Sequence, residues 1–172
     1  MRFVKQQVNS VFGFPRTVNE VSARLVASGV VAQAALWLVT RNPILLATLT
    51  YGFLARVLTG PKLSPLGQFV TRVATPRLPF AEKIVAGPPK RFAQGIGLAC
   101  SAMASVAWAL GVPTLSVAII GLLVVAASLE AFVGFCLGCK IFAIGMKLGI
   151  VPDAVCEECN NLQLRWPHQA AA

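Results

Sequence analysis

Charge is scarce in this sequence, and negative charge is scarcest. Only 12% of its 172 residues are charged, whereas a typical soluble domain has about 25%. Hydrophobic residues make up 56% of the chain, and its mean hydropathy is +0.73. This composition excludes an ordinary water-soluble protein and predicts an integral membrane protein in contact with the lipid bilayer.

The few acidic residues leave a surplus of 15 Lys and Arg over six Asp and Glu, and hence a formal net charge of +9. In a soluble protein such a surplus favours nucleic acid as a partner. Here the basic residues cluster in particular loops. We therefore interpret them as a topology signal and as an attraction to anionic lipid headgroups, and we expect no nucleic-acid partner.

Several catalytic patterns are also missing. The sequence has one histidine, no glycine-rich phosphate loop after a strand and no carboxylate pair at a catalytic spacing. Hydrolase and nucleotide-dependent mechanisms are therefore without support. The histidine, His168, lies in a tail, 162–172, that we expect to be flexible. The first 20 residues have no apolar core of the signal-peptide type, so we expect no cleavable signal.

Four apolar stretches predict an all-α fold, a four-helix transmembrane bundle built from two helical hairpins. The first helix is predicted to begin near Val18, after a capping box formed by Thr17 and Glu20. Asn42 and Pro43 are typical of a second helix start, which makes the first hairpin tight. The expected spans cover about 21–40, 43–58, 92–110 and 115–137 of one membrane domain, 1–172.

The last apolar stretch is too long for one span. It covers 38 residues, Thr114 to Val151, and a helix of that length would measure about 57 Å against a hydrocarbon core of about 30 Å. We predict a break among its glycines and an interfacial or cytoplasmic end, 138–161. On one continuous helix the glycines would share a face that allows close helix packing, within the chain or in a homo-oligomer. These glycines are Gly134, Gly138, Gly145 and Gly149.

Basic residues lie mainly before the first expected span, between the second and third, and after the fourth, whereas the two short loops opposite carry only Arg41. This asymmetry predicts that both termini face the cytoplasm, with the protein in the inner membrane of the cell. The middle loop is predicted to hold a short interfacial helix. A loop packed against a partner protein is the alternative. The apolar face of the predicted interfacial helix would consist of Leu66, Phe69, Val70 and Val73.

Two CxxC pairs are the main chemical signal, Cys136 with Cys139 and Cys156 with Cys159, separated by 16 residues. One interpretation is a four-thiolate site for zinc or an iron–sulfur cluster, because the spacing is typical of such sites. A second is a set of redox dithiols or sulfur carriers that exchange with a cytoplasmic thioredoxin-like protein. In the third, the cysteines only pack, as we expect for Cys100.

For the redox interpretation we assign roles by local charge. Lys140 would favour a thiolate at Cys136 and Cys139, so we predict these two as the reactive pair and Lys140 as its stabiliser. Acids flank the second pair and oppose thiolate formation there. Cys156 and Cys159 are therefore assigned a relay role.

Three segments, "GPPKRFAQGIG", "LEAFVGFCLGCKIF" and "LGIVPDAVCEECNN", together resemble a bacterial integral-membrane family known as domain of unknown function 4395. The resemblance extends from about Asn19 to Asn161 and carries no established activity. It implies a thioredoxin-like or sulfurtransferase partner. The matching residues are Arg91, Gln94, Glu130, Cys136, Cys139, Cys156, Cys159 and Asn160.

The leading hypothesis is a membrane-anchored thiol module in cytoplasmic redox or sulfur handling. One alternative is a structural or accessory subunit whose cysteines hold a metal or merely pack. A small transporter is another, because Glu130 places a costly carboxylate inside a span, where such residues are functional candidates.

Overall fold

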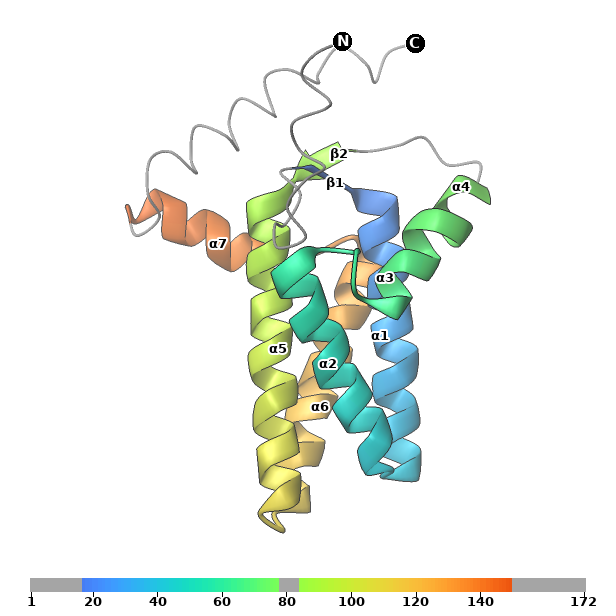
Figure 1. The fold of residues 1–172 in the computed structure, drawn as a ribbon. Coiled ribbons are helices and arrows are strands. Elements are labelled where there is room, and N and C mark those ends of the chain that lie inside the picture. The colour runs from blue at the N-terminus through green and yellow to red at the C-terminus, as the bar shows by residue number, and fades with distance from the viewer. Residues whose placement is uncertain (1–16, 78–83, 150–172) are drawn as a thin grey trace.

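The computed structural model describes residues 17–77 and 84–149 of the chain (Figure 1). The fold is all-α, as predicted, apart from one two-stranded antiparallel ribbon. Two short π-helical turns, η2 and η3, continue neighbouring helices. In chain order the elements are β1 (Thr17–Asn19), α1 (Glu20–Thr40), α2 (Pro43–Thr59), α3 (Pro65–Phe69), η2 (Val70–Ala74), α4 (Thr75–Arg77), β2 (Ile84–Ala86), α5 (Gly87–Ala109), α6 (Pro113–Ser128), η3 (Leu129–Val133) and α7 (Leu137–Lys147).

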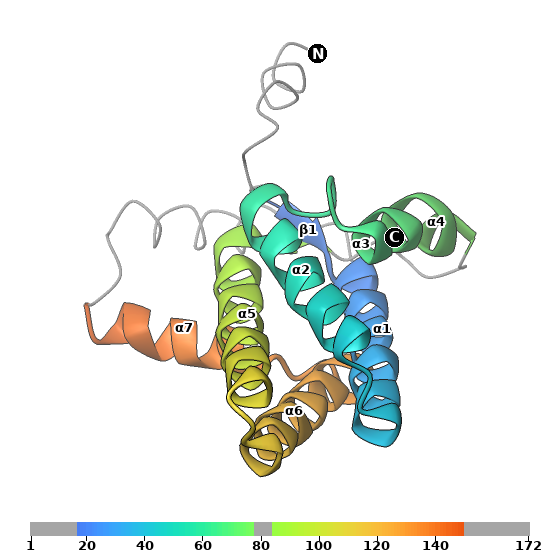
Figure 2. The same cartoon turned by 60° about the horizontal axis from the view of Figure 1, so that its bottom comes forward.

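Helices α1, α2, α5 and α6 form the body of the structure. Helix α1 packs against α2 and α6, and α5 packs against the same two helices, so the four close into a ring (Figures 1 and 2). In the part of the chain that the structure describes, three helical stretches are long and apolar enough to cross a membrane: Glu20–Thr40, Gly87–Ala109 and Pro113–Val133. Helix α2 is apolar but, at 17 residues, is shorter than these three stretches. The four-span bundle therefore remains a prediction. The long apolar helices support the prediction of a membrane protein.

The core of the ring combines large apolar side chains with small residues that allow close approach. Trp37 and Ile120 are fully buried. The ring of Phe53 packs directly on Gly97, where a Cβ atom would lie 2.3 Å from it. The Ser116 hydroxyl donates to the Ala104 carbonyl at 2.6 Å and joins α6 to α5. Such polar links between helices satisfy groups that lipid cannot.

The predicted start of the first helix was wrong by two residues. Residues Thr17–Asn19 pair as a strand with Ile84–Ala86, and α1 begins at Glu20. The N-cap is Asn19, whose side chain accepts from the Val21 amide at 3.0 Å. The second start is confirmed, because Asn42 caps α2 by accepting from the Ile44 amide and Pro43 is its first residue.

The middle loop contains the predicted helix, and it runs through α3, η2 and α4. Its apolar face packs partly on the protein itself. Val70 is buried, and the Leu66 side chain lies against Gly29 of α1, whereas Phe69 is exposed. Both placements of this loop, in the headgroup region and against a partner, remain predictions.

The predicted glycine break occurs at Gly134, whose φ of 74° lies in the left-handed region that glycine adopts most easily. Helix α7 then points away from the ring (Figures 1 and 2). The expectation of one glycine face was therefore wrong, because Gly134 ends one helix and Gly138 belongs to the next. Gly138 packs closely on Ala93 of α5 instead.

Candidate functional site

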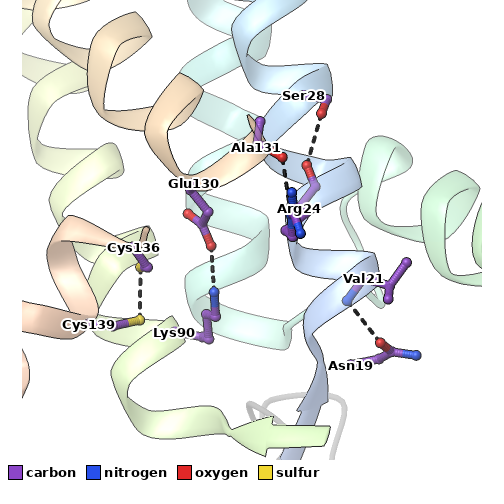
Figure 3. A network of polar contacts seen from close by, with 9 residues as sticks. All are labelled: Asn19, Val21, Arg24, Ser28, Lys90, Glu130, Ala131, Cys136 and Cys139. Atoms are coloured by element: carbon purple, nitrogen blue, oxygen red, sulfur yellow. Dashed lines mark hydrogen bonds and ion pairs between the residues drawn. The ribbon is translucent and has the colours of Figure 1, made fainter. Parts of the chain in front are cut away.

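Two thiols meet at the amino end of α7. Cys136 is the N-cap of this 11-residue helix, and Cys139 lies in its first turn. The thiol of Cys139 donates to the sulfur of Cys136 at an Sγ–Sγ distance of 2.8 Å (Figure 3). Unpaired amides give a helix amino terminus a partial positive charge, which favours a thiolate there. The structure thus brings the first predicted pair together in a setting suited to sulfur chemistry.

The break before α7 is held by Arg24 of α1. Its guanidinium donates to the carbonyl of Ala131 at 3.1 Å (Figure 3). It also donates to the carbonyl of Phe132 at 2.9 Å. A cation at the carboxyl end of a helix satisfies the last carbonyls and opposes the helix dipole. This contact ends the α6–η3 helix at Gly134 and sets where α7 begins, and hence where Cys136 lies.

An ion pair lies beside the thiols. Lys90, in the first turn of α5, donates to Glu130 of η3 at 2.6 Å, and the two side chains are only 11% and 14% exposed (Figure 3). Glu130 therefore has a basic partner, which lowers the cost of a carboxylate in a membrane helix. Lys90 was not predicted as a site residue, because the only sign of it in the sequence was that Glu130 needs a basic partner.

The thiols of the pair differ in acidity. The hydrogen bond from Cys139 lowers the pKa of Cys136 below its ordinary value, and the positive charge of Lys90 acts in the same direction against burial and Glu130. The same hydrogen bond, together with burial, raises the pKa of Cys139. Cys136 is therefore the better nucleophile, and Cys139 holds the proton.

Lys140, the predicted thiolate stabiliser, contacts an aromatic ring. Its ammonium lies over the ring of Phe135 at 5.7 Å from the centroid, and the residue is exposed. Lys90 lowers the pKa of Cys136 from the side of α5. The role of Lys140 as a thiolate stabiliser remains a prediction.

A pocket of about 90 Å³ adjoins Cys136. Cys136, Glu130 and Gln94 bring sulfur and polar groups to it, and its other walls are apolar, with Phe53 among them. Behind Gln94 lies Arg56 of α2, whose Nε donates to the Gln94 Oε1 at 2.8 Å. The pocket is thus a small, mostly apolar space with a few polar groups.

A metal site receives no support from the described residues. Within 17–77 and 84–149, no three side chains of His, Cys, Asp or Glu gather as they would around a metal ion. Cys136 and Cys139 could supply two thiolates for zinc or a cluster, but Cys156, Cys159 and Asn160 lie outside the described residues. The four-thiolate site therefore remains a prediction.

Comparison with known families bears on the same residues. The family described as domain of unknown function (DUF4395) matches residues 18–147. The chain belongs to the DUF4395 family. The match confirms the resemblance seen in the sequence, and it includes the ion pair and the first cysteine pair but ends before Cys156. No curated protein and no solved structure matches the chain.

Proposed function

We propose that this DUF4395 protein is an integral-membrane thiol–disulfide module with Cys136 as its nucleophile and Cys139 as its resolving thiol. The observation that carries the proposal is the 2.8 Å contact of the two sulfurs at the amino end of α7. A CxxC pair in that position has a lowered pKa at its first cysteine for a physical reason, the helix terminus and nearby positive charge. The hydrogen bond from Cys139 is the main cause that lowers the pKa of Cys136, and the positive charge of Lys90 adds to it.

The exchange proceeds in two displacements. The Cys136 thiolate attacks one sulfur of a partner's disulfide, forms a mixed disulfide and releases one partner thiolate. The Cys139 thiol loses its proton and attacks the Cys136 sulfur, which releases the second partner thiolate and leaves a Cys136–Cys139 disulfide. The partner gains two electrons and the pair loses two. The reverse sequence lets a reduced partner restore the dithiol.

We further propose that all four ring helices span the inner membrane and that α7 lies along its cytoplasmic surface. Exposed apolar residues recur on one face of α7 at helical spacing, as in an interfacial helix. Lys140 and Lys147 are exposed on the same helix and suit anionic headgroups. The apolar face consists of Leu137, Ile141, Ile144 and Leu148.

The exchange is tested with a thioredoxin whose second active-site cysteine is Ser and whose first carries a thionitrobenzoate group, which leaves when Cys136 attacks. Because Cys139 resolves the mixed disulfide, Cys139→Ser is expected to remain covalently joined to thioredoxin on a non-reducing gel. Cys136→Ser should form no adduct, and Cys100→Ser serves as the matched control that behaves like the native chain. An adduct of equal yield with Cys136→Ser would contradict the assigned role.

The metal content of the purified protein distinguishes the thiol module from a four-cysteine metal site. A thiol module purified without oxygen is expected to contain no stoichiometric zinc or iron. About one equivalent of zinc or cluster per chain, lost when Cys156 and Cys159 become Ser, would instead make the four cysteines one structural site.

A further inference from the structure

Two polar groups at the pocket beside Cys136 are not used by dithiol exchange with a protein: Gln94 in its wall and Arg56 behind Gln94. Arg56 is only 5% exposed, so its charged guanidinium is buried inside an apolar bundle. It donates to Gln94 at 2.8 Å and to the Ser64 hydroxyl at 3.2 Å, and it lies over Phe53 at 4.6 Å from the ring centroid. Within the described part of the chain, its Nη2 has no hydrogen-bond partner.

Arg56 fixes the orientation of Gln94. A guanidinium can only donate, so the Gln94 atom that it binds must be the acceptor oxygen, Oε1. The other end of that amide is then a donor, and Gln94 lines the pocket. With Oε1 held by Arg56, the amide nitrogen is the Gln94 group left to donate to a ligand acceptor such as a carbonyl oxygen.

The remaining walls favour an apolar ligand that arrives from lipid. Phe53 and Leu123, which line the pocket, are buried. Leu137 and Ile141 also line it, and both are exposed on the apolar face of α7. Because these two residues join the pocket to that face, a lipid-soluble molecule can enter with its tail outside. A volume of about 90 Å³ suits the carbonyl edge of a ring and leaves the tail in the membrane.

We infer that the pocket binds the carbonyl edge of a lipid-soluble quinone, which accepts the electrons of the Cys136–Cys139 dithiol. This inference rests on the proposed thiol function and names its membrane substrate class. Gln94 donates to the quinone oxygen, and Glu130, which lines the pocket and is paired with Lys90, passes protons. Two thiols plus one quinone give one disulfide plus one quinol, a transfer of two electrons and two protons. The quinone is reduced, and the pair is oxidised.

The test uses the full chain in detergent, with its dithiol reduced and the reductant removed, under anaerobic conditions. The probe is a fully substituted benzoquinone with a ten-carbon tail, because full substitution prevents addition of thiols to the ring. Loss of quinone absorbance is followed together with loss of free thiols. We expect one quinol for every two thiols lost, and no reaction with Cys136→Ser.

The matched variant is Gln94→Glu, which keeps an acceptor for Arg56 but removes the donor to the quinone. We expect its quinone reduction, divided by its exchange rate with a small disulfide, to fall by about three- to tenfold, since one hydrogen bond is lost. An unchanged ratio would overturn the role of Gln94.

Two further outcomes distinguish a failure of the quinone inference from a failure of the proposed thiol function. If the pair exchanges with small disulfides but leaves the quinone oxidised, the quinone inference is wrong and the thiol function stands. If neither reaction occurs, both are wrong.

Discussion

At the scale of single residues, two opposite charges act on Cys136. Lys90 lowers the pKa of its thiol and Glu130 raises it. Since Lys90 and Glu130 bind one another at 2.6 Å, each also masks the other. The reactivity of Cys136 therefore depends on a balance that either substitution alone would disturb, in opposite directions.

Replacing Lys90 by Met should raise the pH midpoint for alkylation of Cys136 by about one pH unit, because a nearby cation is lost and Glu130 is left unmasked. Replacing Glu130 by Gln should lower the midpoint. The rate of alkylation of Cys136 is measured by mass spectrometry across a pH series.

Lys140→Met is the matched control for the Lys90 substitution, because Lys140 is a basic neighbour in sequence whose ammonium lies over Phe135. It should move the midpoint less than Lys90→Met does. Shifts of the same sign for Lys90→Met and Glu130→Gln would contradict this electrostatic account.

The sequence indicated only part of this site. Cys136, Cys139 and Glu130 were identifiable because spacing and an apolar context make them conspicuous. Lys90 was not, because it precedes Glu130 by 40 positions and only the packing of α5 beside η3 joins them. Arg56 was equally hidden, since its bond to Gln94 depends on how α2 meets α5.

At the scale of elements, the break at Gly134 decides where the thiols lie. Helix starts could be predicted where one short segment contains all the partners, as at Asn42. The geometry beyond Gly134 could not be predicted in this way. A prediction from an ideal continuous helix does not include the hydrogen bonds from Arg24 of α1 to the carbonyls of Ala131 and Phe132. Periodicity describes a helix only up to the point where a distant residue ends it.

Gly134→Ala tests the importance of this break. Gly134 has φ of 74°, and Gly111 has φ of 75° at a turn with open space around it, so an added Cβ strains both backbones similarly. Both Ala variants should lose about 1–2 kcal/mol of unfolding free energy. Only Gly134→Ala should also slow alkylation of Cys136, because it favours a continued helix that carries the thiol away from Lys90. Equal thiol reactivity in the two variants would show that the break does not position the site.

At the scale of the whole molecule, the ring has two unlike ends. The short connections 41–42 and 110–112 lie at one end, and the ribbon, α3 and α7 lie at the other (Figure 1). The membrane character and the helical hairpins were predictable from apolar length alone. The ring order and the departure of α7 depend on contacts between distant helices, which composition does not encode.

The proposed orientation is tested with two single cysteines in a chain whose own cysteines are Ser. Val112 and Leu63 are equally exposed, at 47%, and lie on opposite sides in the proposed topology. A membrane-impermeant maleimide should label Val112→Cys in intact cells and Leu63→Cys only after the membrane is opened. The reverse pattern would invert the topology and place the thiol site outside the cytoplasm.

A redox titration of Cys136 and Cys139 shows whether these two thiols form one reversible dithiol. The variant retains only this pair, with Cys100, Cys156 and Cys159 replaced by Ser, and is equilibrated over a range of reduced to oxidised dithiothreitol before alkylation and mass spectrometry. We predict that both alkylation sites disappear together in one reversible two-electron transition, and that Cys139→Ser abolishes it. If both cysteines remain alkylated even under the most oxidising mixture, the pair is not a dithiol centre and the account fails.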